Sequence, residues 1–81
     1  EQQLDETTYL FSARLDVEYL NQEYKLNIPE NDSYGTLGGF IVNASKEIPQ
    51  KGNQITIDNF HFVIEEATNT KIEVVKMTIS D

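Results

Sequence analysis

The stretch that decides the fold lies between Tyr34 and Gly52 and reads YGTLGGFIVNASKEIPQKG. Apolar residues recur in it at helical spacing, so the sequence predicts an apolar-faced helix over residues 36–45. Gly38 and Gly39 interrupt that helix, and each costs about 1 kcal/mol relative to alanine in a helix interior. Adjacent glycines in a helix are typical of close packing, because a missing Cβ lets another backbone approach. We therefore expect a buried helix packed on a sheet, with both glycines at the contact.

The same stretch carries stop signals and an alternative interpretation. Pro49 prevents continuation of the helix, and Gly52 predicts a turn into a strand that begins near Gln54. Ser33 is a candidate cap for the helical turn that leads into the glycine pair. The alternative is a loop that cradles phosphate, since glycines at a helix N-terminus occur in anion sites. No Lys-Ser/Thr pair and no GxGxxG spacing is present, so close packing is favoured.

Length and charge exclude several classes of function. The 81 residues predict one domain with a small core. The chain lacks cysteine, which excludes disulfides and cysteine metal sites, and it has no apolar run long enough to predict a membrane span. Its net charge of −8 is uneven, because residues 1–34 hold eight acidic and two basic residues, whereas residues 35–81 hold six and four. Nucleic acids and anionic lipid headgroups are therefore poor partners.

The N-terminal part predicts a linker, a strand and a helix. Residues 1–6 are polar and acidic and are interpreted as a linker from a preceding domain, with the domain itself over residues 7–81. Alternating apolar residues predict a strand over residues 7–14. Asp16 is a good N-cap for the next helix, which Asn27 and Pro29 are expected to end. The residues expected to face water along this helix are Glu18, Asn21, Gln22 and Lys25.

A period of two returns after the central stretch and predicts a three-stranded meander. Asp58-Asn59 is a two-residue turn of types that tolerate positive φ, flanked by isoleucines and phenylalanines that alternate with other residues. Residues 67–70 form the next turn and residues 72–80 the last strand, where a bulge near Val74-Val75 would bring most apolar residues onto one face. The predicted fold class is α+β, with strand-helix-helix followed by a three-stranded antiparallel meander in one small domain.

No catalytic or metal-binding set is visible in the sequence. His61, the only histidine, alternates with two phenylalanines and is expected on the solvent face, without a nucleophile beside it. Glu65 and Glu66 face opposite ways on a strand unless a bulge intervenes, so they predict no carboxylate dyad. Glu30 and Asp32 share a loop able to hold Mg²⁺, but the spacing of a calcium loop is missing. We therefore predict neither an enzyme nor a metal ligand, and an unrelated hydrolase is disfavoured.

Nearly the whole chain resembles a known family. The residues that carry the resemblance are Ala13-Arg14-Leu15, Leu20-Asn21, Leu26-Asn27-Ile28-Pro29, Tyr34-Gly35-Thr36-Leu37-Gly38-Gly39-Phe40-Ile41, Ile48-Pro49-Gln50-Lys51-Gly52-Asn53, Asp58-Asn59-Phe60-His61-Phe62-Val63 and Lys71-Ile72 with Val75. This pattern resembles the CorC/HlyC transporter-associated domain of hemolysin-like and magnesium/cobalt-efflux-type membrane proteins, where it follows a pair of CBS domains. The chain departs from the family at Gly35, where an acidic residue is usual, and at Lys46-Glu47 and Asn59, where glycine is usual.

The resemblance implies an α+β fold like one subdomain of certain flavin-binding proteins, and a flavin or adenine nucleotide follows only from that analogy of fold. It also implies a non-catalytic accessory domain on the cytoplasmic face of a CBS-containing ion transporter. Its partners would be the CBS and membrane domains of the same protein, with a homodimer as a further option. The alternative is a module that binds a nucleotide, a flavin or a divalent cation at the helix start. The family-motif residues, structural or in a ligand site or interface, are Tyr34, Thr36, Leu37, Gly38, Gly39, Pro49 and Gly52.

Overall fold

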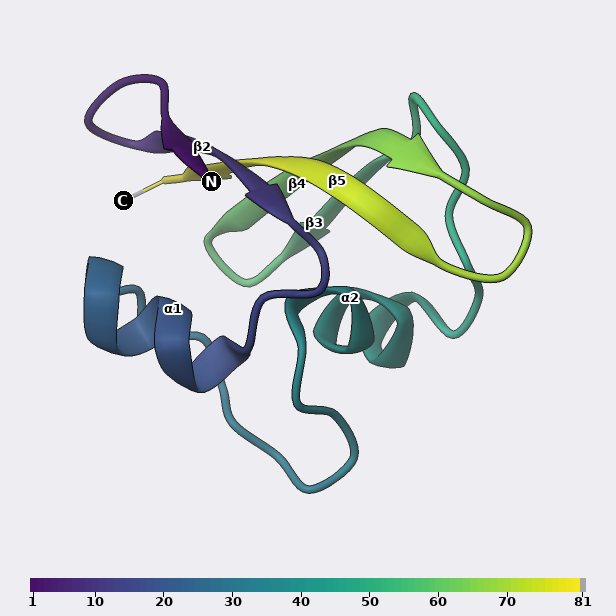
Figure 1. The fold of residues 1–81 in the computed structure, drawn as a ribbon, viewed down its shortest axis with the longest axis horizontal. Coiled ribbons are helices and arrows are strands. Elements are labelled where there is room, and N and C mark those ends of the chain that lie inside the picture. The colour runs from purple at the N-terminus through teal and green to yellow at the C-terminus, as the bar shows by residue number, and fades with distance from the viewer. Residues whose placement is uncertain (81) are drawn as a thin grey trace.

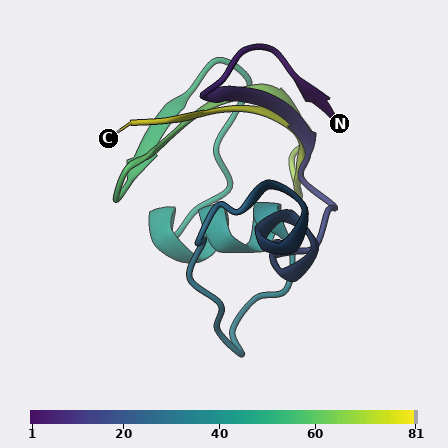
Figure 2. The same cartoon turned by 90° about the vertical axis from the view of Figure 1, so that its left-hand side faces the viewer.

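The computed structural model describes residues 1–80 and has the predicted α+β class. Helices α1 (Val17–Tyr24) and α2 (Leu37–Ser45) lie against one face of an antiparallel sheet of five strands (Figures 1 and 2). The sheet order is β1-β2-β5-β4-β3, so β2 extends the predicted meander by pairing with β5. Among residues 1–80, neither helix has the length and apolarity that a membrane span requires. The strands are β1 (Gln2–Gln3), β2 (Thr8–Ser12), β3 (Gln54–Ile57), β4 (Phe60–Ala67) and β5 (Ile72–Ile79).

One apolar core lies between the sheet and the helices. Tyr9 on β2 pairs with Met77 on β5, and Met77 pairs with Phe62 on β4, so three buried side chains form one row across the sheet. Helix α2 adds Leu37 and Ile41, both without exposed surface. Each such side chain contributes about 1.5–3 kcal/mol when it is fully removed from water. The helical spacing read from the sequence therefore reflects the face that α2 turns toward the sheet.

The interpretation of residues 1–6 as a linker needs correction at Gln2 and Gln3. These residues form β1, in which Gln2 lies opposite Leu10 and Gln3 opposite Tyr9. Both glutamines are exposed, so the strand is held by backbone pairing at a sheet edge rather than by buried side chains. An edge strand of this kind leaves no apolar alternation in the sequence, which is why the pattern predicted a linker. The domain boundary itself stays a prediction.

The end of α1 and the cap of α2 differ from the sequence-based expectation. Helix α1 ends at Tyr24 rather than near Asn27, because Lys25 turns into the left-handed region with φ 58° and donates its N–H to the Asn21 carbonyl. Asp16 does occupy the N-cap position, although its side chain makes no capping hydrogen bond. Helix α2 is capped by Thr36, whose hydroxyl accepts from the Gly39 N–H at 3.1 Å, so the prediction of Ser33 as the cap is wrong.

The meander has the predicted hairpin and more irregular pairing than expected. Asp58 adopts φ 53° in the turn between β3 and β4, which confirms a turn that requires positive φ. The pairing of β4 with β5 shifts register twice, once past Glu65 and once at the β5 residue Glu73. The second shift lies one residue from the bulge predicted near Val74. It lets Ile72 and Val75, of opposite parity, both be buried on the helix side.

Candidate functional site

The family-motif stretch lies at the start of α2, where two segments are held together by backbone hydrogen bonds. The Leu37 N–H donates to the Leu15 carbonyl and the Gly38 N–H to the Ala13 carbonyl, both at 2.9 Å. In the other direction the Val17 N–H donates to the Gly35 carbonyl at 2.9 Å. The exit of β2, the start of α1 and the start of α2 therefore form one rigid junction.

The two glycines occupy different contacts in this junction. A Cβ on Gly38 would lie 3.1 Å from the Ala13 Cβ and 3.2 Å from the Ala13 carbonyl oxygen, so this glycine allows α2 to meet the end of β2. A Cβ on Gly39 would lie 3.0 Å from the Tyr34 Cβ and 3.3 Å from the Thr36 hydroxyl. Gly38 thus lies at the predicted helix–sheet contact, whereas Gly39 packs on the loop that precedes its own helix. The prediction that both glycines meet the sheet holds for Gly38 alone.

The hydrogen bonds of this junction argue against a phosphate site at the start of α2. An anion at a helix N-terminus binds the free N–H groups of the first turn. Here the N–H groups of Leu37, Gly38 and Gly39 already donate to Leu15, Ala13 and Thr36. The neighbouring cavity is also acidic, which repels a phosphate further. The structure therefore does not support the nucleotide alternative at this position.

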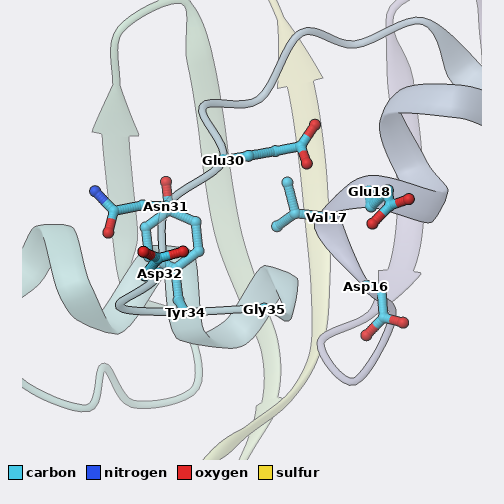
Figure 3. A pocket seen from close by; sticks show the side chains of 8 residues that line it. All are labelled: Asp16, Val17, Glu18, Glu30, Asn31, Asp32, Tyr34 and Gly35. Carbon is cyan, nitrogen blue, oxygen red and sulfur yellow. The ribbon is translucent and has the colours of Figure 1, made fainter.

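That cavity, the acidic notch, has a volume of about 460 Å³ and lies between the start of α1 and the loop before α2. Its carboxylates come from Asp16 and Glu18 on the α1 side and from Glu30 and Asp32 on the loop (Figure 3). Figure 3 shows them pointing in different directions, with Asp16 turned away from the loop residues. The residues that line the notch are Asp16, Val17, Glu18, Glu30, Asn31, Asp32, Tyr34 and Gly35.

Tyr34 forms one wall of the acidic notch and ties its loop together. Its hydroxyl donates to the Pro29 carbonyl, and its ring contacts the ring of Phe40 with centroids 5.4 Å apart. Burial raises the pKa of Tyr34, and the negative charge of Glu30 raises it further. The hydroxyl therefore stays neutral and acts as a hydrogen-bond donor, which gives this family-motif residue a structural role.

Within residues 1–80, no group of three or more His, Asp and Glu side chains gathers closely enough to hold a metal ion. Glu30 and Asp32, the loop pair considered for Mg²⁺, lie apart from any third ligand of this kind. A register shift does occur at Glu65, but Glu66 lies 3.5 Å from the Lys51 ammonium and is thereby engaged in an ion pair. The Nδ1 atom of His61 shares a hydrogen bond with the Thr56 hydroxyl at 2.8 Å. These groups form no catalytic arrangement.

A second cavity, the glycine groove, lies on the other side of the α2 start and has a volume of about 350 Å³. Gly38 and Gly39 lie along it, and its apolar walls include Val42 of α2 and Ile48 of the following loop. Its charged lining residues are Arg14 and Lys71, and no acidic residue among residues 1–80 lines it. The groove therefore combines an apolar surface with positive charge in an acidic domain.

The remaining family-motif residues shape the connection from α2 to β3. Pro49 is buried directly after the exposed Ile48. Gly52 has φ 90° and open space around it, and the Asn53 N–H donates to the Gln50 carbonyl at 3.0 Å across the turn. The Gly52 N–H donates to the Ile64 carbonyl at 2.7 Å. Gly52 thus helps to place the start of β3 beside β4, and neither Pro49 nor Gly52 lines either cavity.

The sequence did not reveal two contacts that fix the parts around α1. Asn21, expected to face water, donates from Nδ2 to the Ile28 carbonyl and accepts from the Ile28 N–H, both at 2.8 Å. One carboxylate oxygen of Glu1 accepts from the hydroxyls of Tyr19 and Tyr24, both at 2.6 Å. The pairs are 7, 18 and 23 residues apart, so no local pattern announces them.

The whole chain was compared with known proteins. A family model described as the CorC_HlyC transporter-associated domain matches residues 2–81. The chain belongs to the CorC/HlyC transporter-associated domain family. A magnesium and cobalt efflux protein CorC from Pasteurella multocida (strain Pm70) is 29% identical over 79 residues, which are 98% of this chain and 26% of that protein. The chain thus spans about a quarter of the length of the curated relatives that it matches.

Solved CorC_HlyC structures share the fold. The transporter-associated domain from Nitrosomonas europaea is 28% identical with a TM-score of 0.79, and the match covers 99% of this chain and 94% of that one. A CorC-associated region from Neisseria meningitidis MC58 reaches a TM-score of 0.86 at 16% identity, covering 98% and 96%. The resemblance drawn from the central stretch is therefore confirmed. At Lys46, where it leads one to expect glycine, the backbone has φ 66°, a conformation that glycine adopts readily.

Proposed function

We propose that this CorC/HlyC domain is a non-catalytic regulatory domain of a membrane ion transporter, on the cytoplasmic face and next to CBS domains. It acts by docking on neighbouring domains of the same protein. Family membership and the magnesium and cobalt efflux relative support the assignment to a transporter. The relatives are about four times as long as the matched region, which leaves length for further domains on which this one would dock.

The observation that carries the proposal is an uncovered face of the sheet. Both helices lie on one side of the sheet, and neither covers the opposite face (Figure 2). The residues there alternate with the buried core residues of their strands, and all but one are half-buried. Lys76 is the single formal charge among the six residues named below, although a quarter of the chain's residues are charged, and Glu65 and Glu66 border them at the register shift in β4. We name this surface the bare sheet face; it consists of Leu10, His61, Val63, Val74, Lys76 and Thr78.

A binding domain without chemistry changes transport only by binding one state of the transporter more tightly than another. The bare sheet face would provide the apolar part of that contact. The acidic notch beside α1 would meet basic groups of the partner, and salt would weaken that part. The resulting coupling is expected in the range of about 1–3 kcal/mol, a change of about 5–150-fold in an equilibrium.

Deletion of residues 7–80 from the full-length transporter tests the proposal. We expect the truncated protein to insert in the membrane and to transport, with an altered rate or an altered response to regulators, measured as ion flux in vesicles. Unchanged flux and unchanged regulator response would leave the domain without the proposed role.

A point variant locates the contact. Val63→Glu places a charge on the bare sheet face of the full-length protein and should reproduce the effect of the deletion. Glu23→Gln at an exposed position of α1 is the matched control, because it changes one charge outside both the bare sheet face and the acidic notch and should leave flux closer to the wild type. An effect of the control equal to that of Val63→Glu would contradict docking through this face.

A further inference from the structure

The glycine groove has a chemistry opposite to that of the domain as a whole. The chain has a net charge of −8, yet the charged residues that line this groove are the two cations Arg14 and Lys71. The side chain of Arg14 is 70% exposed, and its ion pair with Glu73 is long at 3.7 Å. Within residues 1–80, Lys71 takes part in no ion pair. Ile48 is 36% exposed at the edge of the groove. The complementary occupant is an acidic segment that carries an apolar side chain.

The chain itself contains such a segment in the acidic loop, residues 4–7 between β1 and β2. Leu4 is 47% exposed, more than the other large exposed hydrophobics Tyr19 and Ile48, and Asp5 and Glu6 follow it directly. Figure 1 shows the loop projecting beyond the sheet, at the opposite end from the turn between β4 and β5. None of its residues lines the glycine groove of the same molecule. The loop is therefore available to another molecule.

The acidic loop is ordered before any binding. The N–H groups of Leu4 and Asp5 both donate to the Thr8 carbonyl, at 2.8 and 3.3 Å. The Asp5 carboxylate accepts from the Thr7 N–H at 2.9 Å, which lowers the pKa of Asp5. A loop that is already fixed loses little conformational freedom when it binds, so a small contact suffices for measurable affinity.

We propose that the acidic loop of one copy of this domain occupies the glycine groove of a second copy. Leu4 would cover Ile48 and Val42, while Asp5 and Glu6 would lie near Arg14 and Lys71. Loop and groove are different surfaces, so the contact is either reciprocal in a two-fold dimer or repeats from copy to copy. This inference is independent of the transporter assignment, since it concerns only the isolated domain.

The contact is expected to be weak and dependent on salt. One apolar anchor and two charged pairs form much less than a standard interface of about 1,600 Å². Surface charge pairs are screened over about 10 Å at 0.1 M salt, so association should fall as salt rises. In a larger assembly that holds two copies near each other, the effective concentration would compensate for the weak affinity.

Sedimentation velocity of the isolated domain over a concentration series, at low and high salt, gives the first test. We expect concentration-dependent association that salt weakens. A domain that stays monomeric at every concentration and at low salt would overturn the proposal.

Two half-variants then identify the surfaces. The loop variant Leu4→Ser with Glu6→Gln leaves Asp5 in place, and the groove variant Arg14→Gln with Lys71→Gln leaves the glycines in place. Each alone should lose self-association by about tenfold or more. Their equimolar mixture should recover a heterodimer, because the groove variant supplies an intact loop and the loop variant an intact groove. The control Lys25→Gln with Lys76→Gln makes the same charge change outside the groove and should associate like the wild type.

The remaining outcomes are also decisive. Circular dichroism melts identify a variant that fails to fold. In that case Glu6→Lys replaces the loop variant and Lys71→Glu replaces the groove variant. A mixture that does not associate, or half-variants that both associate like the wild type, would show that the copies meet through other surfaces. Loss of association with the loop variant alone would place the acidic loop on a different partner surface, and the proposal would fail.

Discussion

At the scale of single residues, backbone conformation and lack of space decide which substitutions this domain tolerates. Glycine is required at position 38 because Ala13 approaches closely, and at position 52 because the backbone has φ 90°. Gly35 has neither constraint, since nothing lies within 4 Å of the position of its missing Cβ. Lys46 shows the reverse situation, because a long side chain occupies a backbone conformation with φ 66°. These residues give two predictions about stability.

The first prediction compares two glycines of the central stretch. Gly38→Ala should lower the free energy of unfolding by about 1–3 kcal/mol, because the new methyl meets the backbone of Ala13 and weakens the junction. Gly35→Ala should be neutral or stabilise by a few tenths of a kcal/mol, since it only restricts the unfolded chain. Urea unfolding of both variants checks this. Equal stability of the two variants would contradict the close contact at Gly38.

The second prediction concerns the end of α2. Lys46→Gly should stabilise the domain by about 0.5–1 kcal/mol, because glycine removes the cost of a left-handed conformation and this gain exceeds its greater freedom when unfolded. Lys46→Ala serves as the control, since it removes the same charge but keeps a Cβ, and it should give no such gain. The midpoints of urea unfolding distinguish the two. A gain with alanine equal to that with glycine would assign the effect to charge instead of backbone conformation.

At the scale of elements, two polar contacts place α1 and its neighbours. The Glu1 carboxylate connects the β1 end to α1 through Tyr19 and Tyr24. The Tyr24 ring also contacts the rings of Tyr9 and Phe11, with centroids 5.2 and 5.1 Å away. Asn21 braces the loop that follows α1 by its two bonds to Ile28. Helix α1 is thus positioned from both sides by side-chain hydrogen bonds.

The third prediction is a pH dependence of this Glu1 contact. Hydrogen bonding to Glu1 raises the pKa of both Tyr19 and Tyr24 to about 12 from an ordinary value of 10.0. Because the folded-state pKa is raised, the contribution to stability is complete below pH 10.0 and is lost as the pH rises through about 12. The same contact lowers the pKa of Glu1, so its contribution is present above pH 4.5 and is lost as the pH falls through the lowered pKa.

Tyrosinate absorbance and urea unfolding over alkaline pH check this prediction. Glu1→Ala should bring the titration of Tyr19 and Tyr24 back toward pH 10.0 and flatten the alkaline loss of stability. Glu6→Ala is the matched control, since it removes an exposed acidic residue from the same segment. If both variants titrate like the wild type, Glu1 does not hold these hydroxyls.

The fourth prediction concerns the brace at Asn21. Asn21→Ala leaves the part-buried backbone N–H and carbonyl of Ile28 without partners, so it should cost about 1–3 kcal/mol of unfolding free energy. Gln22→Ala changes the neighbouring amide, whose hydrogen bond to Glu18 is exposed and long at 3.4 Å, and should have little effect. Thermal and urea melts provide the comparison. Equal melting of the two variants would mean that the brace contributes nothing.

At the scale of the whole molecule, charge and shape are unevenly distributed. Carboxylates surround the notch beside α1, two cations line the glycine groove, and the bare sheet face carries one formal charge with Glu65 and Glu66 at its border. An acidic domain of this kind should repel polyanions, because binding to nucleic acid depends on cations that neutralise phosphates. Shape and charge together favour protein partners.

The fifth prediction follows from that distribution. We expect no measurable affinity of the domain for DNA or RNA at physiological salt, despite the two cations at the glycine groove. Fluorescence anisotropy with labelled single- and double-stranded oligonucleotides measures it. A micromolar affinity that falls with salt would show that the groove can overcome the net charge of −8.

The sequence by itself determined the features that depend on neighbours along the chain. Helical spacing around Leu37 and Phe40 placed α2, and alternation on both sides of Asp58 placed the β3–β4 hairpin. The residue pattern of nearly the whole chain, most specific at residues 34–41, carried the resemblance to the family, and the net charge predicts that nucleic acids are poor partners. These signals are strong because periodicity and turn chemistry act over a few residues.

The tertiary structure alone decided the features that depend on partners far along the chain. Two exposed glutamines became β1 because the edge of β2 offers backbone hydrogen bonds, and Asn21 turned to Ile28 because the loop returns beside α1. Gly38 and Gly39 look alike in sequence, yet one meets Ala13 across the junction and the other meets its own loop. The acidic notch, the glycine groove and the bare sheet face likewise arise only where distant segments pack together, since local sequence does not specify which surfaces remain open.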